Sequence, residues 1–353
     1  MKVLHLGKFE PDAAGGIETV QRLHERYLRT KIEWFSINFT KQDRRRVGKT
    51  FMAFPCIMLS SQPISLGYIW AAMKNFKKYD LVHIHLPNFL ALGLSLMVRP
   101  DKLVIHWHSD VIGKGLLSRL LRPVEKWLVS RATHVVFTSE AYLEASYIDH
   151  PGAEVIPLSI DYRVGEPVQS QVIVDDNSEF RFLSVGRLVN YKNYDDLIQQ
   201  FKRLPSNWKL AIVGSGPDKK ILKSRISSLD LNSRVELLGY LSSAELEERY
   251  RTSDALILWS NSRAEAYGLV LLEAYARGLP LIVYKNIGSG MVDIVEQTRF
   301  SLSATDLSTS KEEIDSLLSV AIREQIEAEA ETLFSPKVEI QSWLALYKRM
   351  MNQ

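Results

Sequence analysis

The sequence predicts an α/β protein made of two doubly wound domains, each a parallel sheet with helices on both faces. The chain has 353 residues, more than one hydrophobic core usually accommodates, so we expect two domains of ordinary size. Hydrophobic residues make up 46% of the chain and charged residues 24%, which is typical of globular proteins and sufficient for two cores. Short β-rich runs alternate with amphipathic helical segments, and this alternation indicates parallel sheets covered by helices.

The strand-like runs fall into two sets, one in each half of the chain. The first set occupies residues 2–6, 32–38, 81–85, 102–108 and 133–139. The second set occupies residues 181–186, 208–214, 234–239, 254–259 and 280–284. Helical periodicity lies between the runs, for example at Ile17, Val20, Leu23, Tyr27 and Leu28.

The boundary between the domains is expected after the first set of strands. Residues 160–179 lose helical periodicity and gather glycine, proline and acidic residues, as a linker does. We therefore expect an N-terminal domain over residues 1–162, a linker over 163–179 and a C-terminal domain over 180–335. The last segment, residues 336–353, contains Trp343 and Tyr347 and is expected to pack back on the N-terminal domain as a helix.

Several classes of protein are disfavoured by composition. The single cysteine, Cys56, rules out an internal disulfide. The amino terminus leads into a strand without the apolar stretch of a signal peptide, so we expect a cytoplasmic protein. The most apolar window, residues 81–98, is interrupted by polar residues and predicts a strand and a helix rather than a membrane span. A net charge of +3 is too small to indicate nucleic acid as a partner.

Two glycine pairs follow predicted strands, where doubly wound sheets bind ligands. Gly15 and Gly16 precede a helix, and Gly214 and Gly216 come directly after WKLAIV, residues 208–213. Glycine allows close approach of the backbone to an anion, and a helix start supplies free N–H groups. The same glycines are also explained by a tight strand-to-helix turn, and neither pair completes a G-x-G-x-x-G fingerprint.

The segment EAYGLVLLE holds two acids, Glu265 and Glu273, eight positions apart. If a helix starts near Gly268, its first N–H groups lie between the two carboxylates. Carboxylates accept hydrogen bonds from diols and helix starts favour phosphate, so this layout fits a nucleotide diphosphate sugar. The alternative is an ordinary helix start with one acid before it and a second acid on its solvated face.

These residues resemble a known family. EAYGLVLLEAYARGLP looks like the E-x7-E signature of the retaining glycosyltransferases of family 4, which have the GT-B architecture of two Rossmann-like domains facing across a cleft. Five further stretches resemble motifs of the family and recur in its order along the chain: AAGGIE, DLVHIH, VIPLSID, SVGRLVNYKN and IVGSGP. Of these, VIPLSID resembles the family's interdomain strand. The stretch GSG at residues 288–290 stands where many members have a paired glycine, and it somewhat resembles mannosyltransferases of surface polysaccharide pathways.

The resemblance implies roles for particular residues. Arg187 and Lys192 would hold the pyrophosphate and neutralise the leaving group. Glu265 would contact the donor sugar, Glu273 the ribose, and His108 the reacting sugar. Further donor contacts are implied at Gly15, Gly16, Gly214, Gly216, Tyr240, Leu241, Tyr267, Gly268, Leu269 and Val270, with the base near Tyr240 and Leu241.

Histidines form two H-x-H pairs, His83 with His85 and His106 with His108, at the ends of two predicted strands. Four imidazoles could bind zinc, but no cysteine or local acid completes a recognisable metal spacing. The resembled family reacts without metal, so we expect no metal and no other cofactor. Packing or hydrogen bonding by the histidines, and a position for His108 in the active site, both stay open, with His85 as a weaker candidate on the acceptor side.

The implied activity is retaining transfer of a hexose from a nucleotide diphosphate sugar, GDP-mannose or a UDP-sugar, to a glycan or lipid-linked acceptor in surface polysaccharide or glycolipid synthesis. The departing diphosphate would accept the acceptor's proton while the domains close around it. A nucleotide-sugar epimerase of the same architecture and a non-catalytic sugar-nucleotide-binding module are the alternatives. A nicotinamide-dependent oxidoreductase is disfavoured because neither glycine loop completes the dinucleotide fingerprint.

A basic segment of the first domain suggests a peripheral membrane contact on the inner face of the membrane. It carries Lys114, Arg119, Arg122 and Lys126 among leucines and Trp127, a combination suited to anionic bilayers. The alternative is a helix packed on its own sheet with a solvated basic face, and Pro123 interrupts any single long helix.

Overall fold

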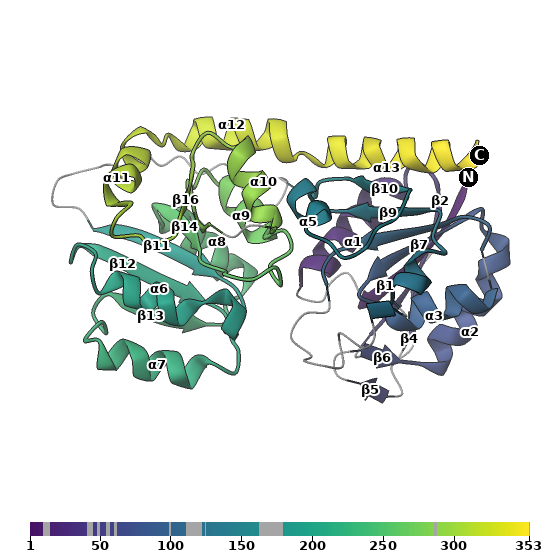
Figure 1. The fold of residues 1–353 in the computed structure, drawn as a ribbon, viewed down its shortest axis with the longest axis horizontal. Helices are drawn as coiled ribbons and strands as arrows, with labels where there is room; N and C mark the ends of the chain where they lie inside the picture. Colours follow the sequence, from purple (N-terminus) through teal and green to yellow (C-terminus); the bar gives the residue numbers. More distant parts are fainter. Residues whose placement is uncertain are drawn as a thin grey trace. The chain divides into compact units, whose positions relative to one another are not determined.

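The computed structural model (Figure 1) describes residues 1–9, 15–40, 45–47, 50–53, 57–59, 62–98, 100–110, 122–123, 125–161, 179–285 and 288–352. The chain folds into two compact units. Unit 1 comprises Met1–Ser159 and Pro336–Gln353, and unit 2 comprises Ile160–Ser335. Cys56 and the predicted linker, apart from Glu179, lie outside the described residues.

Within the described residues, unit 1 contains an eight-stranded sheet in the order β10-β9-β8-β7-β1-β2-β4-β3. These strands are β1 (Lys2–Phe9), β2 (Glu33–Phe39), β3 (Arg45–Val47), β4 (Thr50–Ala53), β7 (Leu81–Leu86), β8 (Leu103–Trp107), β9 (His134–Phe137) and β10 (Ala153–Val155). Neighbouring strands are parallel except β3 and β4. The order reverses between β1 and β7, and such switch points are where doubly wound sheets bind ligands. The short strands β5 (Ile57–Leu59) and β6 (Gln62–Ile64) pair antiparallel beside this sheet.

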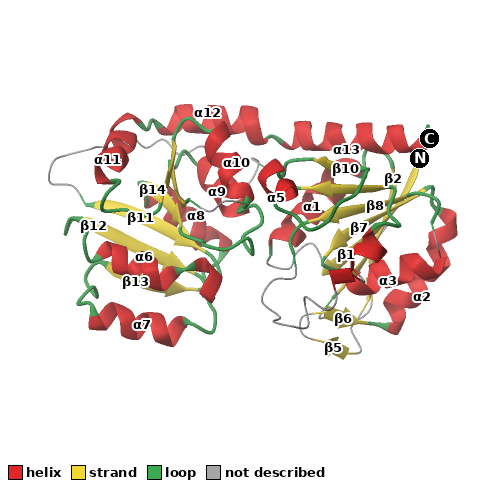
Figure 2. Ribbon diagram, viewed as in Figure 1, coloured by secondary structure: helices red, strands yellow, loops and turns green. Residues whose placement is uncertain are grey.

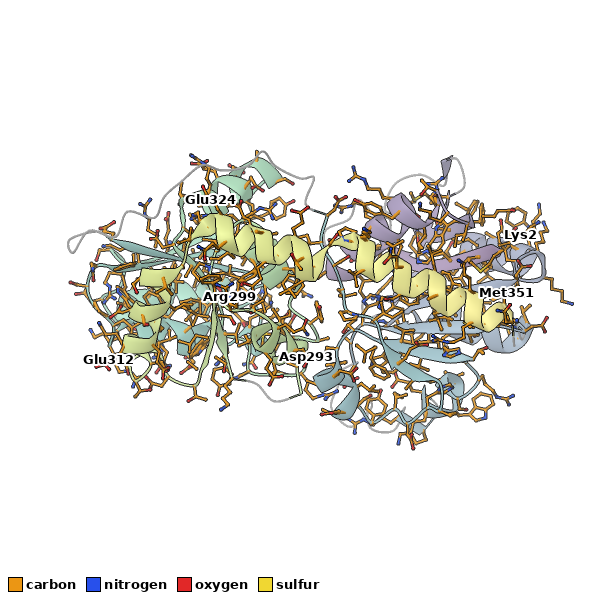
Figure 3. The ribbon with its side chains drawn as sticks, turned by 90° about the horizontal axis from the view of Figure 1, so that it is seen from above. Lys2, Asp293, Arg299, Glu312, Glu324 and Met351 are labelled. Atoms are coloured by element: carbon orange, nitrogen blue, oxygen red, sulfur yellow. The ribbon has the colours of Figure 1, made fainter. Side chains whose placement is uncertain are left out.

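The helices with defined bounds among the described residues of unit 1 are α1 (Gly16–Leu28), α2 (Leu66–Asn75), η1 (Phe76–Lys78), α3 (Phe89–Val98), α5 (Glu140–Glu144) and α13 (Pro336–Met351), and residues 122–123 and 125–129 are helical as well. Serine side chains cap two of them, because Ser65 accepts from the Tyr68 N–H and Ser139 from the Tyr142 N–H. The C-terminal helix α13 buries Trp343 and Tyr347 in the core of this unit, together with side chains from β1, α1, β7 and β8. Lys2 and Met351 therefore lie at the same end of unit 1 (Figure 3).

Unit 2 contains a six-stranded parallel sheet among its described residues, in the order β13-β12-β11-β14-β15-β16. The strands are β11 (Phe180–Val185), β12 (Trp208–Val213), β13 (Val235–Gly239), β14 (Ala255–Leu258), β15 (Leu281–Tyr284) and β16 (Ser301–Ala304). The helices are η2 (Asn190–Lys192), α6 (Tyr194–Phe201), α7 (Lys219–Ser228), α8 (Ser243–Thr252), α9 (Leu269–Tyr275), α10 (Gly290–Gln297), α11 (Lys311–Val320) and α12 (Arg323–Phe334). In each unit, helices flank the strands of the sheet (Figure 2).

The predicted fold class is confirmed, because each unit has a mainly parallel sheet with helices and each of the ten predicted runs forms a strand. Six strands were not predicted from the sequence, namely β3, β4, β5, β6, β10 and β16; each has only three or four residues, too few for a recognisable alternation. One expectation is wrong for most of its length: of residues 155–161, matched to an interdomain strand of the family, only Val155 lies in a strand, at the end of β10. There Ser159 is instead held by the Glu339 carboxylate, which accepts from both its N–H and its hydroxyl.

Candidate functional site

The switch point of unit 2 lies between β11 and β14, which pair directly at Phe182 with Ala255 and at Leu183 with Leu256. Because parallel strands end at the same sheet edge, the loops that follow β11 and β14 meet there. The first loop carries Arg187 and leads into η2 with Lys192. The second carries Glu265 and leads into α9. Three residues selected from the sequence thus belong to the two loops that flank the switch point.

Lys192 and Glu265 form an ion pair at this edge. The Lys192 Nζ contacts Glu265 Oε2, and the two side chains are 8% and 13% exposed. Burial lowers the pKa of Lys192, but the Glu265 carboxylate and two neighbouring tyrosines outweigh that effect, so the pKa of the ammonium lies above its usual value. Lys192 therefore stays charged across the physiological pH range.

Two serines hold the Glu265 loop in place. Ser260 Oγ donates to Glu265 Oε2 at 3.1 Å. Ser289 Oγ donates to the Glu265 carbonyl, and the Gly290 N–H donates to the Ala266 carbonyl at 2.8 Å. The GSG stretch that departs from the family pattern therefore packs against the loop that carries Glu265.

Gly214 and Gly216 have a packing reason of their own. A Cβ at Gly214, whose φ is +141°, would lie 1.9 Å from the Gly186 carbonyl oxygen. A Cβ at Gly216 would lie 2.2 Å from the Leu188 carbonyl oxygen. The absence of a side chain at both glycines therefore lets the loop after β12 approach the loop after β11.

The remaining candidates of unit 2 also follow strands or begin helices. Arg187 is exposed, and Tyr240, which follows β13, is 76% exposed. Leu241 is half-buried between β13 and α8.

The helix α9 begins where the sequence predicts. Gly268 is its N-cap, with a φ of 85° that favours glycine, and Leu269 and Val270 form its half-buried first turn. Tyr267, just before the cap, is 6% exposed. Glu273, further along the helix, accepts a hydrogen bond from the Tyr250 hydroxyl at 3.1 Å.

In unit 1, His108 follows β8 and His85 lies in β7, and their rings contact each other. His85 Nδ1 lies 2.6 Å from His108 Nε2, and the two rings stack with centroids 4.9 Å apart. Burial lowers the pKa of His108 to about 3, and burial likewise lowers the pKa of His85 well below its usual value. Both imidazoles are therefore neutral at physiological pH.

The amino-terminal glycines lie at the start of α1. Gly15 is the N-cap residue and its carbonyl accepts from the Thr19 N–H at 3.0 Å, while Gly16 is the first residue of the helix. Both are exposed. The rest of the glycine loop, residues 10–14, lies outside the described part of the chain.

The basic segment proposed for membrane contact is described only in part. Lys114 and Arg119 fall outside the described residues. The Arg122 guanidinium lies over the Tyr147 ring at 4.7 Å from its centroid, and Lys126 is exposed. None of the helices in the described ranges is both long and apolar enough to cross a membrane.

Comparison with known proteins decides the family. Residues 14–162 match the family described as Glycosyltransferase Family 4, and residues 166–332 match the family described as Glycosyl transferases group 1. The O-antigen chain mannosyltransferase C of Escherichia coli is 28% identical over 316 residues, which are 82% of this chain and 81% of that protein. The chain is a family 4 glycosyltransferase.

A further relative and two solved structures are also similar to this glycosyltransferase. The alpha-monoglucosyldiacylglycerol synthase of Acholeplasma laidlawii is 27% identical over 248 residues, which are 61% of each chain. The sucrose-phosphate synthase of Thermosynechococcus elongatus superposes with a TM-score of 0.79 at 19% identity over 100% of both chains. HepE of Anabaena in complex with UDP superposes with a TM-score of 0.73 at 19% identity, over 99% of this chain and 100% of that one. These structures share the GT-B fold with this chain.

In each unit of this glycosyltransferase, some residues close to the predicted candidates were not selected from the sequence. Ser260 and Ser289 hold the Glu265 loop, and the GSG stretch was the available signal for Ser289. Glu18, in the first turn of α1, is 7% exposed, and burial raises the pKa of its carboxyl. Its position two residues after the Gly15–Gly16 pair was the available signal. His24 lies near the H-x-H pairs in the structure, but its distance from them along the sequence gave no reason to select it.

Proposed function

We propose that this glycosyltransferase binds a nucleotide diphosphate sugar at the carboxyl edge of the unit 2 sheet and transfers its hexose with retention of configuration. The acceptor would be a glycan or a lipid-linked sugar in surface polysaccharide or glycolipid synthesis. The buried Lys192–Glu265 pair at the switch point carries this proposal, since it presents a fixed cation and a carboxylate side by side. A cation suits a diphosphate, and a carboxylate suits the hydroxyl groups of a sugar.

The remaining assignments follow the resemblance. Arg187, exposed in the loop after β11, would join Lys192 on the diphosphate. Glu273 would accept from the ribose diol, and the N–H groups of Gly268, Leu269 and Val270 would meet the phosphates. The backbone near Tyr240 and Leu241 would hold the base.

The same resemblance assigns the chemistry of the transfer. His108 would lie beside the reacting sugar. The departing diphosphate oxygen would take the acceptor's proton, so the protein would contribute position and electrostatic stabilisation rather than a base or a metal.

The mannosyltransferase and the glucolipid synthase named above support donors of the two kinds that the sequence analysis suggested. The bound UDP in HepE supports a nucleoside diphosphate as leaving group. We propose GDP-mannose or a UDP-hexose as the donor.

The test is a donor screen with purified full-length protein. GDP-mannose and UDP-hexoses are incubated with and without candidate acceptors, and released nucleoside diphosphate is measured in the presence and absence of added Mg²⁺ or Mn²⁺. The expected result is acceptor-dependent release without a need for added metal, and a product whose anomeric configuration by NMR equals that of the donor. Conversion of the donor sugar without release would indicate an epimerase, and binding without turnover a non-catalytic module.

A matched pair of variants makes this screen specific. Glu265→Gln removes the charge beside Lys192, whereas Glu296→Gln removes a charge from the exposed face of α10. The first variant should lower kcat by a factor on the order of 10²–10³, the usual loss for a group that stabilises developing charge. The second should leave it unchanged. Equal activity of the two variants would contradict the assignment of Glu265.

Peripheral contact with the membrane is a separate proposal, supported by the exposed Lys126 and Trp127 of unit 1. Trp127 is 52% exposed, and Trp beside Lys suits an anionic bilayer surface. Flotation with anionic and neutral liposomes tests it. Binding to anionic liposomes at low salt that Lys126→Glu weakens would support it, and failure to float with them would reject it.

A further inference from the structure

Six of the eight histidines of the chain lie together inside unit 1. His5, His24, His83, His85 and His106 are 0% exposed, and His108 is 6% exposed. Each neutral imidazole brings one donor and one acceptor into an interior that also contains Val3, Leu23 and Val104. A buried polar atom left without a partner costs about 1–3 kcal/mol, so this cluster needs a physical reason.

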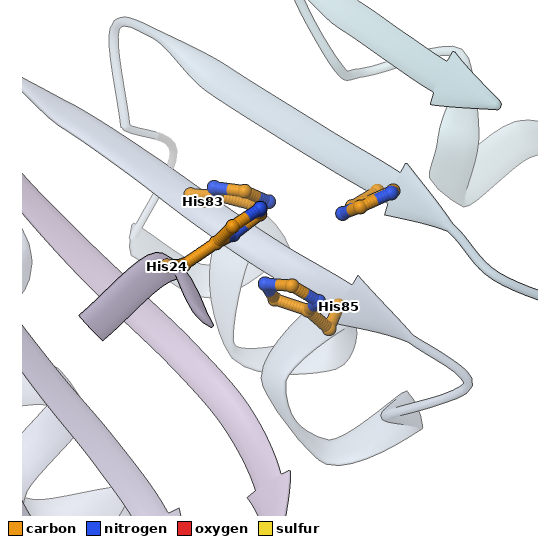
Figure 4. A group of neighbouring side chains, drawn as sticks. His24, His83 and His85 are labelled. Atoms are coloured by element: carbon orange, nitrogen blue, oxygen red, sulfur yellow. The ribbon is translucent and has the colours of Figure 1, made fainter. Parts of the chain in front are cut away.

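Four of these histidines converge. His24, His83, His85 and His106 each offer one ring nitrogen, and these four nitrogens lie within 4.8 Å of one another. Figure 4 shows the rings of His24, which comes from α1, and of His83 and His85, which come from β7, gathered in one place. His106 is the register partner of His85 on the neighbouring strand β8.

In three of these rings, one nitrogen has a hydrogen-bond partner among the described residues and the other has none. One nitrogen of each of three rings has a partner: His24 Nε2 lies 2.8 Å from Glu339 Oε1, His83 Nδ1 lies 2.7 Å from the Tyr347 hydroxyl, and His85 Nδ1 lies 2.6 Å from His108 Nε2. The other nitrogen of each ring, and both nitrogens of His106, are buried and have no hydrogen-bond partner among the described residues.

This division matches the way proteins hold metal ligands. A histidine that binds a metal through one nitrogen usually has its other nitrogen fixed by a carboxylate, a carbonyl or a similar group, which sets the tautomer and the ring orientation. Glu339 is suited to that task for His24, because Trp343 Nε1 and Ser159 also donate to its carboxylate and hold it in place. Binding of an ion through the nitrogens that have no hydrogen-bond partner in the described part of the chain would leave the contacts with Glu339, Tyr347 and His108 in place.

We propose that His24, His83, His85 and His106 bind a divalent transition-metal ion, with Zn²⁺ as the reference ion, in a closed structural site inside unit 1. Imidazole nitrogens suit Zn²⁺, and four of them complete a tetrahedral site. A Zn–N distance of ~2.0–2.1 Å requires the nitrogens to lie ~3.4 Å apart, so the rings would move inward from the 4.8 Å limit.

The ion would have two stabilising effects inside unit 1. It would give partners to ring nitrogens that otherwise have none. It would also bring positive charge close to the Glu339 carboxylate, which is 2% exposed, and would add to the stabilisation that its hydrogen-bond donors already give.

The site is structural because all four ligands are fully buried and no ligand position is left open to a substrate. It would join α1, β7 and β8. Through the contact of His24 with Glu339, which is 315 positions further along the chain, it would also hold α13 in place. It is therefore independent of the transfer reaction, which is proposed to need no metal. The absence of a compact ligand spacing in the sequence follows from the use of three separate elements.

The test compares two buried histidines of the same cluster in untagged full-length protein. His106→Gln removes a proposed ligand, while His5→Gln removes a histidine that lies outside the four and whose two ring nitrogens are equally buried and unpartnered. His5 packs edge-on against His83 and His85, so the two substitutions disturb similar surroundings. Each protein is exposed to Zn²⁺ or Co²⁺, freed of loose metal by gel filtration and analysed for metal content.

Wild type and His5→Gln should retain about one ion per chain and show the intense visible absorption of tetrahedral Co²⁺. His106→Gln should retain none, and a chelator should lower the Tm of wild type and His5→Gln but not that of His106→Gln. No retained metal in wild type, or equal retention by the two variants, would overturn the proposal. If His106→Gln does not fold by circular dichroism, the wild-type Co²⁺ spectrum decides: weak octahedral absorption or none rejects the site.

Discussion

The Lys192–Glu265 pair allows a quantitative prediction, because breaking it leaves one buried charge without its partner. Two unit charges ~4 Å apart attract by ~4 kcal/mol at an effective dielectric constant of ~20. Both side chains are almost buried, at 8% and 13% exposure, so each has lost most of its hydration and the attraction offsets that loss. Removal of one partner from such a pair costs about 3–5 kcal/mol.

The perturbation is a double-mutant cycle with Glu265→Gln, Lys192→Met and both together. Each single variant should lower the free energy of unfolding of unit 2 by about 3 kcal/mol. The double variant should lose about 2 kcal/mol less than the sum of the single losses, because no unpaired charge remains. The coupling should be unchanged across neutral pH: a raised lysine pKa contributes stability that is fully present below the usual value of 10.5 and is lost as pH rises through the higher folded value.

The assay is urea unfolding followed by hydrogen exchange and mass spectrometry, since peptides from β11 and β14 report on unit 2 separately. The dependence of amide-hydrogen protection in these strands on urea concentration gives the free energy of unfolding of unit 2 for each variant. Single losses below about 1 kcal/mol that simply add in the double variant would refute the reasoning, because independent sites add and coupled sites do not. Glu296→Gln, on the exposed face of α10, is the control and should change nothing.

Three further predictions concern single residues. Gly214→Ala should lower the Tm of the protein by several degrees in differential scanning fluorimetry, because its Cβ would lie 1.9 Å from the Gly186 carbonyl oxygen, whereas Gly93→Ala, with nothing within 4 Å, should not; equal Tm values would contradict the packing argument. Glu273→Gln should weaken UDP or GDP binding about tenfold in calorimetry with kcat nearly unchanged, and an unaltered affinity would remove Glu273 from the donor site. Arg187→Ala should lower kcat/KM on the order of 10²-fold while the Tm stays constant, since the side chain is exposed; a lower Tm with full activity would give it a structural role instead.

The architecture could be predicted because it depends on local patterns of apolar and polar residues. The strand at residues 208–214 contains the apolar run LAIV at residues 210–213, as strands of covered parallel sheets do, and the segment after Gly15 shows helical spacing of apolar residues. Short edge strands such as β10 and β16 carry too few residues for such a pattern, so they could not be predicted. The Gly268 cap of α9 could be predicted, because glycine tolerates the positive φ that this position has.

The candidate site could be predicted as a set of residues but not as a set of contacts. Lys192 and Glu265 were selected through separate motifs, yet their ion pair depends on β11 lying beside β14 in the sheet. The packing reason for Gly214 likewise comes from a loop that follows a different strand. Ser260 is an ordinary loop serine in the sequence, and only its distance to Glu265 identifies it as a support of that loop. For Ser289 the GSG stretch marked the position, but its hydrogen bond to the Glu265 carbonyl is a tertiary contact.

The sequence by itself determined the class of fold, the family motifs and the residue types that a sugar-nucleotide transferase needs, because these depend on periodicity and on short spacings along the chain. Only the tertiary structure decided which distant side chains meet: Lys192 with Glu265, Glu339 with His24, and the four histidines with one another. The physical reason is that strand order and helix packing bring together residues far apart in the chain, and burial then fixes their charge and hydrogen bonding.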